Sequence, residues 1–223
     1  MRSPALTLLL MATLGCARIY RPVELAPARP PTQGQALAGV LVSQPWGDNS
    51  RNEGKARSAN LRVLVLGLDN PSHAGAEVLR LGLPEGVTAL TPEAAADVVK
   101  QQSLLHLLYP LIPALLATGS GGSGGGANYI GPTPAMIFGA MAVVGLLVGL
   151  PNLGVANTSN RRLAEFFQTQ AWSPGLLEPG QSRRGLVFLR CQDPSTAFQV
   201  KVFYRAGDGE QVLDLTCPAP APR

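Results

Sequence analysis

Residues 197–217 read AFQVKVFYRAGDGEQVLDLTC, and this stretch decides the fold. Its first half places Phe198, Val200, Val202 and Tyr204 on one face of a strand, with Gln199, Lys201 and Arg205 on the other. A period of two is typical of a β-strand with one buried face. Gly207-Asp208-Gly209 follows, a combination that favours a tight turn between antiparallel strands. The stretch therefore predicts a β-hairpin whose strands cover residues 197–205 and 211–217.

Further strand-like segments precede this hairpin. They are separated by turn signals such as Pro45-Trp46-Gly47-Asp48 and Pro84-Glu85-Gly86. The predicted strands cover residues 36–43, 60–68, 77–83, 87–90 and 185–191. Short strands at this spacing predict a mainly β fold, built as an antiparallel sandwich.

Two of the turn-and-strand signals resemble those of the immunoglobulin-like modules that are common in bacterial lipoproteins. One is Asp69-Asn70-Pro71-Ser72, which follows an early strand. The other is Leu177-Glu178-Pro179-Gly180-Gln181-Ser182, which leads into Gly185-Leu186-Val187-Phe188. The resemblance covers residues 36–90 and 173–217, with residues 91–172 as a helical insert. It implies an immunoglobulin-like sandwich that serves as a binding or structural module, and it brings no active site.

The N-terminus has the pattern of an export signal. Arg2 precedes an apolar run from Ala5 to Leu14, which has signal-peptide length and is too short to span a bilayer. The run ends in Thr13-Leu14-Gly15-Cys16, which resembles the lipobox of bacterial lipoproteins, with Thr where Leu is usual. The resemblance implies that residues 1–15 are removed and that Cys16 carries lipid, such as palmitate. The alternative is an ordinary secretory signal, and in either case we expect export.

Residues 16–35 contain four prolines and almost no apolar period, which predicts an extended tether. Acyl chains on Cys16 would hold the protein at a membrane, since each buried methylene contributes about 0.8 kcal/mol. We therefore expect a lipid-anchored protein of the cell envelope, at the outer membrane or the periplasmic face.

Two cysteines remain besides Cys16. Cys191 and Cys217 lie near the ends of predicted strands, on the same face as the alternate apolar residues of those strands, so both thiols are expected to point inward. Leftover thiols usually pair in an oxidising compartment, so the sequence favours a disulfide between them. The alternative is two separate buried thiols.

Helix signals follow the first group of strands. Thr91-Pro92-Glu93 predicts a helix start, because Thr caps the helix, Pro fits its first turn and Glu complements the helix dipole. This helix should run through Val99. A second helix, with Leu163, Phe166 and Phe167 on one side, is predicted over residues 160–172.

Between these helices, residues 101–160 contain no Asp, Glu, Lys or Arg. Two apolar blocks in this uncharged segment, residues 104–117 and 135–150, are joined by a Gly/Ser-rich link, which predicts a helical hairpin. Each block is shorter than the roughly 20 residues of a spanning helix. Lys100, Arg161 and Arg162 flank the hairpin, and the positive-inside rule would place them in the cytoplasm, whereas a lipoprotein domain lies outside. A hairpin that only dips into the membrane, or one in an outer membrane, avoids this conflict.

Three interpretations of the uncharged segment stay open. The hairpin enters the membrane, with close helix packing at a GxxxG step; it is buried against one sheet; or it contacts a partner protein. The residues expected to make membrane or partner contacts are Leu104, Leu111, Ile137, Phe138, Gly145 and Gly149.

No catalytic or metal-binding pattern withstands inspection. Residues 121–125 fit GxSxG, but neither His73 nor His106 follows Ser123, so the base is missing in the usual chain order. Glycines at 119, 121 and 124 fit GxGxxG, but no acid follows about 20 residues later. The two histidines lie far apart, and no cysteine pair has ligand spacing. The sequence therefore predicts no enzyme, no cofactor and no metal.

The charge is modest and scattered, at +4. Arg161-Arg162 and Arg183-Arg184 lack interleaved aromatic residues, so we expect no nucleic-acid binding. The leading hypothesis is a non-catalytic envelope lipoprotein that binds or scaffolds at the membrane. The alternative is an accessory subunit of an envelope transport or secretion complex, in contact with integral partners through residues 101–160.

Overall fold

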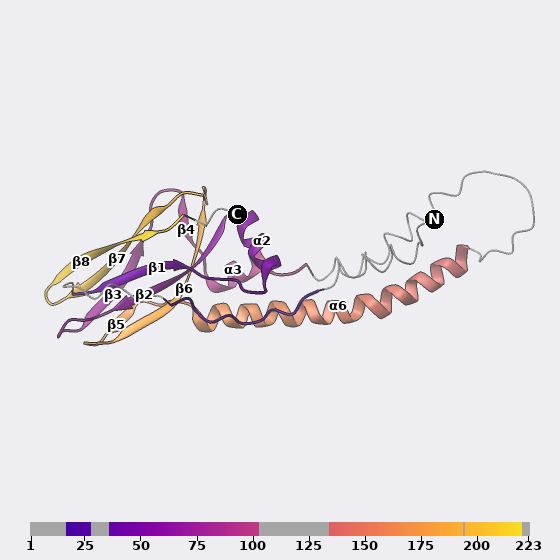
Figure 1. Cartoon of the computed structure of the whole chain (residues 1–223), viewed down its shortest axis with the longest axis horizontal. Coiled ribbons are helices and arrows are strands. Elements are labelled where there is room, and N and C mark those ends of the chain that lie inside the picture. The colour runs from indigo at the N-terminus through magenta and orange to yellow at the C-terminus, as the bar shows by residue number, and fades with distance from the viewer. Residues whose placement is uncertain (1–16, 28–35, 103–133, 194, 220–223) are drawn as a thin grey trace, which may run out of the picture. The chain divides into compact units, whose positions relative to one another are not determined.

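The computed structural model is mainly β, as the sequence predicts (Figure 1). It describes residues 17–27, 36–102, 134–193 and 195–219, with the backbone alone in residues 134–150. The chain divides into two compact units. One comprises Met1–Tyr20 and Gln101–Arg161, and the other comprises Arg21–Lys100 and Arg162–Arg223.

The first sheet has four antiparallel strands in the order β1-β2-β6-β4. Their bounds are β1 Ala38–Ser43, β2 Leu61–Asp69, β6 Ser182–Cys191 and β4 Val87–Ala89. All four predicted strands are confirmed. The central strand β2 does not alternate: every residue in it except Asp69 is buried. A strand that is apolar on both faces needs cover on both faces.

The second sheet also has four antiparallel strands, in the order β5-β3-β7-β8. Their bounds are β5 Gly175–Leu177, β3 Ala76–Gly82, β7 Phe198–Ala206 and β8 Gly209–Cys217. The predicted hairpin is confirmed, because Ala206 pairs with Gly209 across a turn made by Gly207 and Asp208. Gly207 has a φ of +64°, a backbone conformation that favours glycine.

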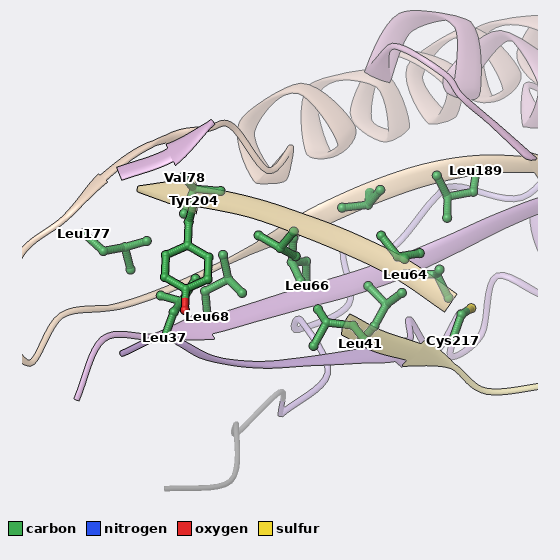
Figure 2. Packing of buried hydrophobic residues seen from close by; sticks show 14 of the residues in the cluster. Leu37, Leu41, Leu64, Leu66, Leu68, Val78, Leu177, Leu189, Tyr204 and Cys217 are labelled. Carbon is green, nitrogen blue, oxygen red and sulfur yellow. The ribbon is translucent and has the colours of Figure 1, made fainter. Parts of the chain in front are cut away.

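One buried cluster draws side chains from both sheets (Figure 2). Leu64, Leu66 and Leu68 of β2 share this cluster with Val78 of β3 and Tyr204 of β7. The Tyr204 hydroxyl donates to Gln211 Oε1 at 2.7 Å, so its ring is buried while its polar tip is bonded.

The other face of the first sheet is covered by aromatic side chains. Phe188 alternates with cluster residues along β6 and therefore lies on the opposite face. Helix α6, Pro134–Gln170, places Phe167 against Phe188 with ring centroids 4.6 Å apart. Trp46 meets Phe167 edge-on at 6.3 Å. This cover explains why β2 and β6 are buried on both faces.

Helix α3, Pro92–Val99, confirms the predicted helix start, since Thr91 Oγ1 accepts from the Ala94 N–H at 3.2 Å. Helix α2, Ser50–Ser58, was not predicted, because its sequence SRNEGKARS has no apolar period. It is held by contacts instead: Asn52 is buried, and its Nδ2 donates to the Val99 carbonyl at 3.0 Å.

The helix predicted over residues 160–172 is present, but its predicted start at residue 160 is wrong. The structure has one continuous helix, α6, that begins at Pro134 and contains Pro151. Buried residues recur along it at Ala156, Ser159, Leu163 and Phe167, every three or four positions. This stripe crosses the predicted start at residue 160 and explains why the helix is continuous there, because packing along one face stabilises a helix where local propensity is weak.

The predicted disulfide is also wrong: Cys191 and Cys217 are free thiols. Both are buried in the cluster that the sheets share, on β6 and β8, so their predicted inward orientation is correct. A buried thiol packs as a small apolar side chain and needs no bond. Arg62 crosses this region and donates to the carbonyls of Thr196 and Pro218.

Burial raises the pKa of both thiols, that of Cys217 to about 11, against the opposing effect of Arg62. The pKa of an unfolded thiol is near 9, so burial of the neutral Cys217 thiol stabilises the fold fully below pH 9, and this stabilisation is lost as pH rises through 11. We predict that the urea midpoint is lower at pH 10.5 than at pH 8.5. The free energy of unfolding should fall by about 1.4 kcal/mol, the equivalent of one pKa unit. Urea unfolding followed by circular dichroism measures this change.

The control is Cys217→Ala, which removes the titrating group and should flatten that part of the pH dependence.

In Cys16→Ser protein, Ellman's reagent should find both remaining thiols only after denaturation. Their absence in denatured, unreduced protein would contradict the free-thiol structure.

Candidate functional site

The two ends of the uncharged segment are bonded to each other. The Gln101 N–H donates to Asn160 Oδ1 at 2.7 Å, and Asn160 Nδ2 donates to the Gln101 carbonyl at 2.9 Å. The side-chain amide of Asn160 thus pairs with the backbone of Gln101 as a neighbouring strand would. The segment leaves and returns at one point.

The N-terminal segment joins the same point. Gln101 Nε2 donates to the Arg18 carbonyl at 2.6 Å and to Ser159 Oγ at 2.9 Å. The Tyr20 N–H also donates to Ser159 Oγ, at 2.9 Å. We call these five residues, Arg18, Tyr20, Gln101, Ser159 and Asn160, the polar junction. It lies within one compact unit and connects the chain just beyond Cys16 to both ends of the uncharged segment.

The polar junction is shielded from water. Ser159 is 1% exposed, Tyr20 3% and Gln101 5%. Gln101 Oε1 is buried and accepts no hydrogen bond from any residue that the structure describes. Burial raises the pKa of the Tyr20 hydroxyl, which keeps it neutral. Loss of one of these buried hydrogen bonds would destabilise the fold, since a buried donor or acceptor without a partner costs about 1–3 kcal/mol of stability.

Residues 21–26 form an extended strap on the unit that contains the sheets. Asn49 Oδ1 accepts from the Arg21 N–H at 3.1 Å, and Asn49 Nδ2 donates to the Arg21 carbonyl at 2.8 Å. Gln44 repeats this arrangement: its Oε1 accepts from the Ala26 N–H at 3.1 Å and its Nε2 donates to the Glu24 carbonyl at 3.0 Å. The predicted tether therefore includes a part that is bound to folded structure.

The predicted contact residues divide into two groups. Cys16, Leu104 and Leu111 lie outside the described residues, as does Ser123. The others, Ile137, Phe138, Gly145 and Gly149, belong to the first part of α6, whose backbone is helical. The hairpin that would join these groups stays a prediction.

The carboxylates and histidines considered from the sequence do not converge. Glu77 pairs with Arg205 at 3.5 Å, and the side chain of Glu93 accepts from Gln168 Nε2 at 3.2 Å. His73 lies exposed in the loop before β3. Within the described ranges, no group of three His, Cys, Asp or Glu residues is placed to hold a metal ion.

Among the helices that the structure describes, none combines the length and the apolar character required to cross a membrane.

Comparison of the chain with protein-family models, with curated proteins and with solved structures finds no match.

Sequence reasoning missed the polar junction. Its signal was present: the uncharged segment begins and ends with amide residues, Gln101 and Asn160, rather than with apolar ones. The sequence does not show which group an amide side chain will bind, because amides form hydrogen bonds equally well with backbone, water or each other.

We predict that Asn160→Ala loosens the polar junction, because it leaves the Gln101 N–H and carbonyl without their partner. The expected loss is about 1–3 kcal/mol, seen as a lower thermal midpoint and as faster tryptic cleavage after Arg18. The matched control is Asn157→Ala, an exposed position one turn earlier in the same helix. Equal behaviour of the two variants would contradict the bonding described.

Proposed function

We propose that the chain is an exported lipoprotein of the cell envelope, acylated at Cys16, that binds or scaffolds at the membrane without catalysis. The observation that carries the proposal is the polar junction. Arg18, two positions after the lipobox cysteine, is bonded through its carbonyl to Gln101, and Gln101 is bonded to Asn160. The lipid anchor and the uncharged segment thus start from one place.

In this proposal the uncharged segment contacts the membrane that holds the acyl chains. A segment whose ends meet must leave and return on one side, as a hairpin that dips into the membrane does. Charged side chains are the most costly residues to place in lipid, and residues 101–160 have none. The polar residues at the two ends of the segment, Gln101 and Asn160, remain in the polar junction.

We further propose that the two sheets form an immunoglobulin-like sandwich. The order β1-β2-β6-β4 corresponds to strands A-B-E-D of that fold, and β3-β7-β8 corresponds to C-F-G. The buried cluster shared by both sheets supports this arrangement. Cys191 and Cys217 then lie on strands E and G, whereas the disulfide of antibody domains joins B and F. This module is a binding or structural one and brings no active site.

The strap limits how far this module extends from the anchor. Residues 17–21 reach at most about 18 Å when fully extended. Asn49 binds Arg21 through both its N–H and its carbonyl, so the chain joins this module within five residues of the lipobox cysteine.

We predict that radioactive palmitate labels the wild-type protein and that Cys16→Ala abolishes both the label and removal of residues 1–15. The readouts are autoradiography and intact mass of the protein from the membrane fraction. Cys217→Ala is the matched control and should keep the label. An unlabelled wild-type protein with an intact leader would overturn the proposal.

A further inference from the structure

Strand β8 is the longest sheet edge in the part of the chain that the structure describes. The first sheet ends at β1 and β4, and the second ends at β5 and β8. Strands β4 and β5 have three residues each and β1 has six, whereas β8 has nine. Among the described strands, β8 pairs only with β7. A short edge resists pairing with another chain, and a long one is available for it.

Every second residue of β8 turns its backbone groups outward from the sheet. Ala206 and Gly209 close a two-residue turn, so they form a hydrogen-bonded pair. Hydrogen-bonded and non-hydrogen-bonded pairs alternate along an antiparallel ladder. The N–H and carbonyl groups of Gln211, Leu213 and Leu215 therefore face β7, and those of the residues between them face outward. All the outward residues are exposed: Glu210, Val212, Asp214 and Thr216.

Strand β8 lacks the features that usually block an exposed edge. It contains no Pro and no Lys, and its register with β7 shows no bulge. Val212, near its centre, is an apolar residue that is 47% exposed. Pro218 follows the strand directly and, because it has no N–H, ends the row of donors. Each outward residue of β8 thus offers one N–H and one carbonyl to an extended partner strand.

The side chains of β8 favour a second copy of the same strand as that partner. When two copies pair in antiparallel orientation about a two-fold axis, outward residues lie opposite outward residues. One register uses all of them. In it, Glu210 lies opposite Thr216. Val212 lies opposite Asp214, and Leu213 faces its own counterpart.

The charges of β8 select this register. A shift of two residues in one direction would place Glu210 opposite Asp214, and a shift in the other would place Asp214 opposite itself. Like charges directly opposite each other are destabilising. Within one copy, Glu210 already pairs with Arg80 at 3.7 Å, and Asp214 faces Lys201 across the ladder with β7. In the favoured register no acid of one copy lies directly opposite an acid of the other.

We infer that two copies of the chain associate through β8, which pairs in antiparallel orientation with β8 of the other copy. Backbone hydrogen bonds supply the attraction, as in other cases of strand addition. Leu213, which packs against the buried cluster of its own copy, adds an apolar contact at the two-fold axis. This interface does not depend on acylation of Cys16, so it adds self-association to the proposed scaffolding function.

Two variants that differ in the sign of one charge test the register. Val212→Lys places a cation opposite Asp214 of the other copy, whereas Val212→Asp places a second acid there. Within one copy the preference is reversed, because position 212 lies opposite Phe203, between Lys201 and Arg205 of β7. A monomer is thus stabilised by Asp and the dimer by Lys. We expect the dissociation constant of the dimer to be about tenfold lower for Val212→Lys than for Val212→Asp.

Native mass spectrometry of the full chain, purified in mild detergent, counts monomers and dimers over a range of concentrations. The matched control is Thr88→Lys against Thr88→Asp, at an exposed position of the edge strand β4. These two variants should have equal dissociation constants. A chain that stays monomeric, or a dimer that is equally stable with Lys and Asp at position 212, would overturn the inference.

Hydrogen exchange provides a second readout on the folded wild-type chain. In the dimer the amides of Val212 and Asp214 should exchange slowly, and dilution to the monomer should release them. The amides of Leu213 and Leu215 should stay protected in both states. Fast exchange of the outward amides in the dimer would overturn the inference, and so would their protection in the monomer, since another segment would then cover the edge. None of these outcomes bears on the acylation of Cys16, which the palmitate label decides separately.

Discussion

The pairing of the Asn160 side chain with the Gln101 backbone is the constraint on which the functional account depends. It closes the uncharged segment at its base, with bonds of 2.7 and 2.9 Å. Gln101 and Ser159 extend this closure to the N-terminal segment through Arg18 and Tyr20. A lipid on Cys16 and an uncharged segment in the membrane are compatible only if both begin on one side, and the polar junction supplies that condition.

The same chemical device recurs in the strap. Asn49 and Gln44 each bond to the backbone through both the oxygen and the nitrogen of one amide. An extended segment without a neighbouring strand has unpaired N–H and carbonyl groups, and a buried group of this kind must find a partner. Side-chain amides provide that partner at single residues, without a further strand. The N-terminal segment is therefore attached by a few specific bonds, while the sheets are stabilised by an apolar cluster that they share.

The sequence predicts the strands well because their signal is local. Alternation identifies β7 and β8, and the apolar run at residues 63–66 of β2 is explained by cover on both faces, including the contact of Phe167 with Phe188. Helix α2 and the three-residue strand β5 lack such a signal and depend on their neighbours. The disulfide prediction is wrong because parity shows only which way a thiol points. The polar junction could not be predicted, since it joins residues 58 or more positions apart through amides that have many other partners available.

Hydrogen exchange at single amides tests the central claim most directly. In the full chain, the amides of Tyr20 and Gln101 both donate to side-chain acceptors and should exchange far more slowly than those of an unstructured peptide. Asn160→Ala should release the Gln101 amide and leave the amides of β2 protected. Unprotected Tyr20 and Gln101 amides in the folded wild-type protein would contradict the account.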